Sequence, residues 1–179
     1  MPRTRALLAL TALLSLATTA AACATPKCAP LSPEGAPPPP GAVTEDMAKA
    51  SSTLDRFHAA AASADEEAYF GLFADGGVFL GTDGKERWTV PQFRTYAHPR
   101  FASGKAWSFR TAHRELQVHS DTAWFDEDLD TANLGPARGS GVLVRDAKGA
   151  WKVAQYNLSI PIPNERFADV KRVIEGGNP

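Results

Sequence analysis

The carboxyl groups of this chain that could do acid–base chemistry gather in one short stretch, Asp126-Glu127-Asp128-Leu129-Asp130. A carboxyl group acts as a general acid or base at neutral pH when an apolar environment raises its pKa. Because side chains alternate along a strand, only one of the neighbours Asp126 and Glu127 can face inward. These two residues are the candidate catalytic pair, and the pattern leaves open which of them faces a pocket. The alternative is a solvated acidic strand end without a chemical role.

Polar side chains that could polarise a bound molecule lie on the strands expected to follow. Gln155 and Asn157 occur in the run Trp151–Ile162, where alternation predicts that they share a face with Val153. On the preceding run, an inward-facing Arg138 would need a carboxylate partner, and Asp126 and Glu127 are the nearest candidates. The alternative places Gln155 and Asn157 on a solvated outer face.

Metal and cofactor sites are not expected. Asp126, Asp128 and Asp130 have the spacing that opens a calcium-binding EF-hand loop, but Thr131 replaces the required glycine and Ala137 the final glutamate. The four histidines do not combine with a cysteine or with one another at zinc-ligand spacing. We therefore predict no metal and no cofactor.

Two other classes of function are also disfavoured. Ser140 lies in Gly139-Ser140-Gly141 within a predicted strand, which is not the strand-to-helix turn of a serine hydrolase. The segment Gly81–Gly84 lacks the glycine spacing and the following lysine of a phosphate-binding loop. The formal net charge is −1 and no basic run occurs, which argues against a nucleic-acid partner.

Helices are expected to come before the sheet. Apolar residues at helical spacing predict an amphipathic helix over Thr44–Ala62. Capping-box patterns at Ser63–Glu66 and Thr89–Gln92 predict two further helices, and Pro99 is expected to end or kink the second of these. Between them, Val78–Leu80 is predicted to form a short strand.

The second half of the chain reads as sheet. Runs rich in aromatic and β-branched residues predict four long strands: Trp107–His119, Thr122–Thr131, Ala137–Asp146 and Trp151–Ile162. The short turns between them favour antiparallel pairing. A short helix is expected over Asn164–Ile174. Helices followed by strands are typical of the α+β class.

This order of elements resembles the cone-shaped NTF2-like superfamily and, within it, the SnoaL-like branch. The stretches that carry the resemblance are Tyr69–Phe73, Gly81–Trp88, Ala123–Glu127, Arg138–Val144 and Trp151–Ser159. Together they span about residues 54–164. The superfamily includes isomerases, cyclases, dehydratases, epoxide hydrolases and non-catalytic binding domains, so the resemblance does not fix a reaction.

The resemblance implies about three helices packed on a strongly curved, mostly antiparallel sheet that leaves a conical cavity. It also implies which residues meet a ligand there: Asp83, Trp88, Trp124, Arg138, Gln155 and Asn157. A small apolar molecule is the expected ligand, and a homodimer is the expected assembly.

The N-terminal segment has the features of an export signal. Arg3 and Arg5 precede the apolar run Ala6–Ala17, and small residues follow up to Cys23. This order predicts a secretory signal peptide over residues 1–22, because the apolar run is shorter than the roughly 20 residues of a membrane-spanning helix. Residues 23–42 are rich in proline and predict a disordered linker, which leaves 43–179 as the folded domain.

Cys23 is the predicted lipidation site. A small-residue stretch that abuts a cysteine is similar to the lipobox of bacterial lipoproteins, although Ala20 stands where that family usually has leucine. The alternative is an unmodified Cys23 that pairs with Cys28, the only other cysteine. The expected location is the periplasm or, through the lipid, a membrane surface.

Two functions follow from these patterns. The first is an exported, lipid-anchored binding domain that holds a small apolar ligand in its pocket or acts through dimerisation. The second is an isomerase, cyclase or dehydratase type of enzyme that uses a pocket carboxylate, Asp126 or Glu127, for acid–base chemistry.

Overall fold

The computed structural model describes residues 44–176; the predicted signal peptide, linker and Cys23 lie outside these residues. The helices are α1 (Glu45–Ala62), α2 (Glu66–Phe70), α3 (Val90–Ala102) and α4 (Phe167–Ile174), with a 3₁₀ turn η1 (Asn164–Arg166) before the last. The strands are β1 (Phe73–Leu80), β2 (Arg87–Thr89), β3 (Phe109–His119), β4 (Thr122–Thr131), β5 (Gly135–Arg145) and β6 (Trp151–Ser159).

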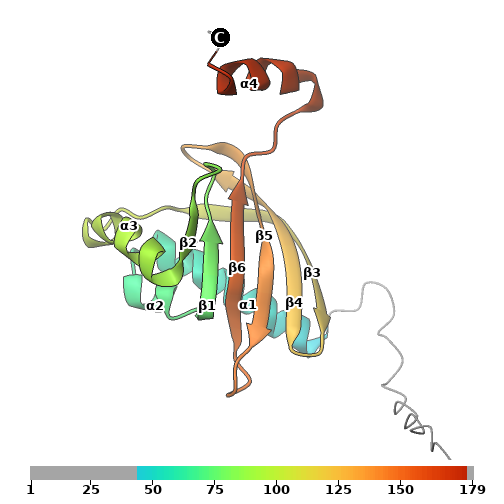
Figure 1. Cartoon of the computed structure of the whole chain (residues 1–179). Helices are drawn as coiled ribbons and strands as arrows, with labels where there is room; N and C mark the ends of the chain where they lie inside the picture. Colours follow the sequence, from blue (N-terminus) through green and yellow to red (C-terminus); the bar gives the residue numbers. More distant parts are fainter. Residues whose placement is uncertain (1–43, 177–179) are drawn as a thin grey trace, which may run out of the picture. The chain divides into compact units, whose positions relative to one another are not determined.

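The strands form one six-stranded sheet in the order β2-β1-β6-β5-β4-β3. Every neighbouring pair is antiparallel except β1 and β6, which are parallel. The sheet is strongly curved, and α1 runs across one of its faces (Figure 1). This arrangement confirms the predicted α+β class and the curved, mostly antiparallel sheet.

Helix α1 follows the predicted pattern closely. The hydroxyl of Thr44 caps it by accepting the Met47 N–H at 3.1 Å. Leu54 and Phe57 lie on its buried stripe, and both side chains are almost inaccessible to solvent. His58 and Thr53 are also buried, so the buried side of the helix carries two polar side chains.

The two later helices differ in detail from the prediction. Asp65, rather than Ser63, caps α2, since its carboxylate accepts the Ala68 N–H at 2.9 Å. The capping box at the start of α3 is present, with the Gln92 side chain accepting the Thr89 N–H at 3.0 Å. Pro99 does not end α3, which continues to Ala102. Pro99 therefore costs only one intrahelical hydrogen bond close to the helix end, where the backbone is least constrained.

Strand β1 begins at Phe73, five residues before the predicted start at Val78, because the intervening segment forms a bulge within the strand. Phe73 pairs with Val153 and Val78 pairs with Gln155, so the glycine-rich segment between Phe73 and Val78 bulges out of the ladder. Strand β2 was not predicted; it has only three residues and pairs with the end of β1.

Helix α4 has no buried residue. Its apolar residues Phe167, Val173 and Ile174 are all exposed. Helix α4 therefore contributes no buried side chain to the core formed by the sheet and α1–α3. Within residues 44–176, none of the helices has both the length and the apolar composition that crossing a membrane requires.

Aromatic side chains fill most of the space between α1 and the sheet. Phe57 stacks on Tyr69 with ring centroids 4.3 Å apart and lies 5.1 Å from Tyr156 on β6. Burial of aromatic rings of this size is the dominant stabilising contribution in a core. Aromatic side chains therefore fill the space between α1 and the sheet at this level.

Candidate functional site

The first candidate site is a cluster of polar side chains buried around Glu127, which is fully inaccessible to solvent. Its Oε1 lies 2.6 Å from Nε2 of His58 and accepts the Tyr156 hydroxyl at 2.9 Å. Its Oε2 accepts Nε–H of Arg114 at 2.9 Å and lies 3.3 Å from the Thr111 hydroxyl. Both carboxylate oxygens are thus fully engaged, as a buried charge requires.

Arg114 connects this cluster to the protein surface. Besides Glu127, its guanidinium donates to the Ser51 hydroxyl at 2.7 Å and to the Asp55 carboxylate at 2.8 Å, both on α1. Its side chain is only 9 % exposed. Arg114 therefore ties β3 and β4 to the helix that crosses the sheet, and its charge balances that of Glu127.

The pKa of Glu127 reflects this balance. Burial by itself raises the pKa, because it penalises the charged form. The hydrogen bond and charge of His58 and those of Arg114 act in the opposite direction, and the net pKa is lowered below the ordinary value of 4.5. Glu127 is thus held as a carboxylate, whereas a general acid at neutral pH would need a raised pKa.

The glycines of the Arg138–Val144 stretch make room for this cluster. Gly139 pairs with Glu127 across the β4–β5 ladder, and a Cβ atom there would lie 2.2 Å from the Tyr156 hydroxyl oxygen and 2.9 Å from Oε1 of Glu127. At Gly141 a Cβ would lie 2.0 Å from the backbone oxygen of Gln155. Both positions exclude a side chain because of close approach.

The second candidate site is a cavity of about 640 Å³, which opens where β1, β6 and the β4–β5 turn end. Most of its wall is apolar or aromatic and comes from β1, β2, α3, β6 and the segment before β3. Its main apolar lining residues are Phe79, Trp88, Phe93, Tyr96, Trp107, Phe109, Leu134 and Leu158. This volume lies within the range of small-molecule sites, about 300–1,000 Å³.

Flat aromatic faces build one side of the cavity. Phe79 stacks on Phe93 with centroids 3.9 Å apart, and Trp88 stacks on Tyr96 at 4.5 Å. The rings of Trp88 and Phe93 are nearly parallel, with 9° between their planes. The angle between the planes of Trp107 and Phe93 is 26°. Phe79 and Phe93 are buried within this stack, so Trp88 and Tyr96 present most of its accessible ring surface to the cavity.

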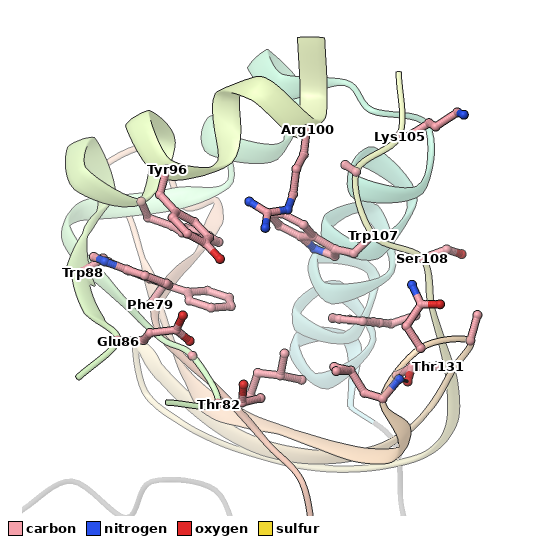
Figure 2. A pocket seen from close by; sticks show the side chains of 18 residues that line it. Phe79, Thr82, Glu86, Trp88, Tyr96, Arg100, Lys105, Trp107, Ser108 and Thr131 are labelled. Carbon is pink, nitrogen blue, oxygen red and sulfur yellow. Dashed lines mark hydrogen bonds between the residues drawn. The ribbon is translucent and has the colours of Figure 1, made fainter. Parts of the chain in front are cut away.

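Two charged groups point into this cavity. In Figure 2 the carboxylate of Glu86 reaches in from the β1–β2 side and the guanidinium of Arg100 reaches in from α3. Glu86 Oε2 accepts the Asp83 N–H at 3.3 Å. Arg100 lies over the Tyr96 ring, with its guanidinium carbon 4.8 Å from the ring centroid. The cavity is therefore apolar in its walls and charged at two places.

The cavity and the Glu127 cluster are separate. Phe109 lines the cavity and its ring centroid lies 6.2 Å from that of His58, but His58, Glu127, Arg114 and Tyr156 are not among the lining residues. The buried carboxylate is thus behind the cavity wall, where it cannot reach a ligand directly.

The structure separates the two candidate catalytic residues. Glu127 faces inward and Asp126 faces outward and is exposed, as strand alternation in β4 dictates. Arg138 does not face inward and pairs with neither Asp126 nor Glu127. Its side chain is half exposed and lies 3.5 Å from Asp128 on the outer face.

All six predicted ligand-binding residues lie within the described part of the chain, and Trp88 alone lines the cavity. Asp83 is exposed and stabilises its own turn by accepting the Lys85 N–H at 2.8 Å. Trp124 is 49 % exposed on the outer face of β4. Arg138 lies on the same outer face.

Gln155 and Asn157 lie on the outer face too, and the predicted shared face with Val153 is wrong. Val142 pairs with Gln155 but Leu143 pairs with Val153, so β6 carries one extra residue, Ala154. This bulge inverts the alternation beyond it. Val153 and Tyr156 are both buried, while Gln155 is exposed.

Sequence reasoning did not assign a role to the partners of Glu127, which are His58, Arg114 and Tyr156. It also missed the two charged residues that point into the cavity, Glu86 and Arg100. His58 carried a signal, since it follows Leu54 by four residues on the apolar face of α1. No sequence pattern pointed to Arg100 or Glu86, because their positions depend on how α3 and the β1–β2 turn pack together. Among residues 44–176, no three His, Cys, Asp or Glu side chains are grouped to hold a metal ion.

Comparisons with known proteins agree with this architecture. Among curated proteins, none matches the chain. An NTF2-like protein of unknown function from Pseudomonas putida has 15 % identity and a TM-score of 0.56, over 67 % of this chain and 91 % of that one. A ketosteroid isomerase-like protein from Erwinia carotovora atroseptica has 18 % identity and a TM-score of 0.51, over 67 % and 99 %.

A third solved structure is also similar: a protein of unknown function with a cystatin-like fold from Nostoc punctiforme, at 16 % identity and a TM-score of 0.56, over 66 % of this chain and 94 % of that one. At these identities the likeness concerns the fold, which is the NTF2-like cone. The model of the SnoaL-like domain family matches residues 50–163, which include α2, α3 and the whole sheet. The chain therefore belongs to the SnoaL-like domain family.

Proposed function

We propose that this protein is a binding domain for a small planar apolar molecule. The observation that carries the proposal is the cavity of about 640 Å³, one side of which is built from near-parallel aromatic rings. Burial of apolar ligand surface against such a wall contributes roughly 25 cal/mol per Å² before the cost of association. Planar ligands gain most, because they can stack on several rings at once.

The position of Glu127 supports binding over catalysis by that residue. A general base must lie within hydrogen-bond reach of the proton that it abstracts. Glu127 is buried behind the cavity wall, and both its oxygens already accept hydrogen bonds. Asp126 faces away from the cavity. We therefore assign Glu127 a structural role in the core and regard Asp126 as a solvated residue of the outer face.

Native mass spectrometry of the freshly purified protein tests the binding function. A retained ligand would appear as a discrete added mass that disappears on denaturation, and extraction would identify it as a planar apolar compound. If no mass is retained and a panel of planar apolar compounds leaves the thermal unfolding midpoint unchanged, the proposal is wrong.

A second candidate function rests on Glu86. Its carboxylate is half buried and points into the cavity (Figure 2), so an acid–base reaction of the isomerase, cyclase or dehydratase type would have Glu86 as its proton acceptor. Turnover of a β,γ-unsaturated ketosteroid to its conjugated isomer, abolished by Glu86→Gln, would favour this function. Binding of the steroid without turnover would favour the binding domain.

We also propose that the domain is exported and anchored by a lipid on Cys23. The charge, hydrophobe and small-residue order of residues 1–22 supports export, and the cysteine that follows supports lipidation. The mass of the mature N-terminus tests both. A diacylglyceryl group on Cys23, lost in Cys23→Ser, is the expected result; an unmodified N-terminus would contradict the anchor.

A homodimer stays a prediction, and the outer face of the sheet is the surface that we propose for it. Trp124 is half exposed there, and an aromatic side chain of this size is typical of an interface centre. Sedimentation velocity of the wild type and of Trp124→Arg tests this. A wild-type dimer that Trp124→Arg converts to a monomer is expected, whereas a wild-type monomer would contradict it.

A further inference from the structure

The cavity carries a positive charge that no side chain of the described residues neutralises, and this charge defines its ligand more closely. We propose that the cavity selects planar ligands that bear an anionic group, a carboxylate or a sulfonate, and that Arg100 pairs with that group. The inference rests on the proposed binding function and goes beyond it by naming the chemical class of the ligand.

Arg100 is positioned for this role by α3. It lies in the last turn of the helix, and its guanidinium points into the cavity next to Tyr96 (Figure 2). The guanidinium carbon lies 4.8 Å from the Tyr96 ring centroid, so the aromatic face holds the group without consuming its N–H donors. Within residues 44–176, no carboxylate lies within ion-pair distance of Arg100.

Another arginine of the same helix shows the contrast. Arg94 donates from Nε to Glu66 at 2.7 Å and contacts Glu67 as well, and these carboxylates raise its pKa. Arg94 thus has protein partners on α2, whereas Arg100 faces the cavity without one. A guanidinium with free donors matches the two oxygens of a carboxylate or sulfonate.

The nearby carboxylate does not cancel this charge. Glu86 Oε2 accepts the Asp83 N–H at 3.3 Å and packs so closely on Gly81 that a Cβ there would lie 2.1 Å from it. Glu86 is therefore held on the opposite side, at the β1–β2 turn. The Lys105 side chain points away from the cavity (Figure 2), so Arg100 supplies the basic group that reaches into it and Glu86 supplies the acidic one.

The aromatic wall sets where the rest of such a ligand lies. The Trp88–Tyr96 stack adjoins Arg100, whose guanidinium lies over Tyr96, and Trp107 lines the same cavity. A ring system placed against Trp88 and Trp107 would direct a substituent toward the guanidinium. The anionic group would then be partly desolvated by the rings, where its attraction to Arg100 is stronger than in open water.

Two fluorescent probes with the same ring system test the inference. 1-Anilinonaphthalene-8-sulfonate carries a sulfonate, and N-phenyl-1-naphthylamine is the same skeleton without it. We expect both to bind the wild-type protein. Arg100→Gln should weaken sulfonate binding about two- to fivefold, as for an exposed ion pair, and leave binding of the neutral probe unchanged.

Matched variants sharpen the test. Arg87→Gln removes the same charge from an exposed residue that neighbours Trp88 but does not line the cavity, and it should leave both affinities unchanged. Arg100→Lys keeps a charge and should retain most of the sulfonate affinity. Added salt should weaken only the sulfonate probe.

The outcomes separate the two proposals. If neither probe binds the wild type, the binding function itself fails. If the neutral probe binds but Arg100→Gln leaves the sulfonate affinity unchanged, or lowers both affinities equally, the anion preference is overturned while the binding function stands.

Discussion

His58 Nε2 lies 2.6 Å from Glu127 Oε1, and both side chains are buried. This contact joins α1 to β4 across the core and is completed by Tyr156 and Arg114, which come from two further strands. One carboxylate thus fixes the helix, β3, β4 and β6 relative to one another. The cavity lies at the end of the same cone, so its shape depends on this contact.

Glu127→Gln should destabilise the fold. The change leaves Arg114 as a buried cation without its main partner, and loss of one member of a buried ion pair costs about 3–5 kcal/mol. Because the glutamine amide retains some hydrogen bonds, we expect a loss of about 2–4 kcal/mol in the free energy of unfolding. Urea denaturation followed by circular dichroism measures it.

Asp126→Asn is the matched control for this change. It alters the neighbouring residue in the same chemical way, but on the exposed face of β4. Its effect should stay within about 0.5 kcal/mol. Equal effects of the two variants would contradict the structural role of Glu127.

Acid should destabilise the wild type through Glu127. The pKa of this carboxyl is lowered from 4.5 in the folded state, so the unfolded state binds its proton first as the pH falls. The stabilisation from Glu127 is complete above about pH 4.5 and is lost as the pH falls through the lower folded pKa. Glu66 and Asp146, whose pKa values are also lowered, add to the acid sensitivity in the same direction.

The difference between wild type and Glu127→Gln isolates this contribution. The difference in the free energy of unfolding between the two proteins should narrow as the pH falls below about 4.5, because the stabilising charge of Glu127 is then lost. Denaturant titrations at several pH values measure it. A gap that is independent of pH down to 3, or that widens in acid, would show that Glu127 is not a stabilising carboxylate.

Gly139→Ala should disturb the cluster from the opposite strand. Its Cβ would lie 2.2 Å from the Tyr156 hydroxyl oxygen and 2.9 Å from Glu127 Oε1, both of them buried. Overpacking of this kind costs typically about 1–3 kcal/mol. Gly84→Ala is the control, because a Cβ there meets nothing within 4 Å. Thermal unfolding should separate the two variants, and a neutral Gly139→Ala would argue against the close contact.

The acidic stretch shows what strand alternation can predict. It required one of Asp126 and Glu127 to face inward, and the structure confirms this with Glu127. The cue for its partner was also present, since His58 interrupts the apolar face of α1. Strand alternation could not predict that His58 pairs with Glu127, because the two residues are 69 positions apart in the sequence.

Two bulges limited the rest of the prediction. In β3, Thr111 pairs with Leu129 and His113 with Asp128, so the ladder gains a residue and both Thr111 and Arg114 can turn toward Glu127. In β6, the extra residue turns Tyr156 inward. Each bulge inverts the alternation beyond it and depends on the partner strand, so neither could be derived from the spacing within one strand.

The cavity was predictable only in part. Trp88 is one of the ligand-facing residues that the family resemblance implied, and it lines the cavity. Arg100 and Glu86 meet there because α3 and the β1–β2 turn close over the end of the sheet. That arrangement depends on tertiary packing between segments that the sequence alone does not place side by side.

Titration of N-phenyl-1-naphthylamine into the wild type, Trp88→Ala and Trp124→Ala tests the binding cavity most directly. The two variants remove the same side chain, one from the cavity wall and one from the outer face of the sheet. We expect saturable binding with one site per chain, weakened about tenfold or more by Trp88→Ala, as for loss of a large apolar contact, and unchanged by Trp124→Ala. Absence of saturable binding, or equal weakening by both variants, would contradict a ligand site in the cavity.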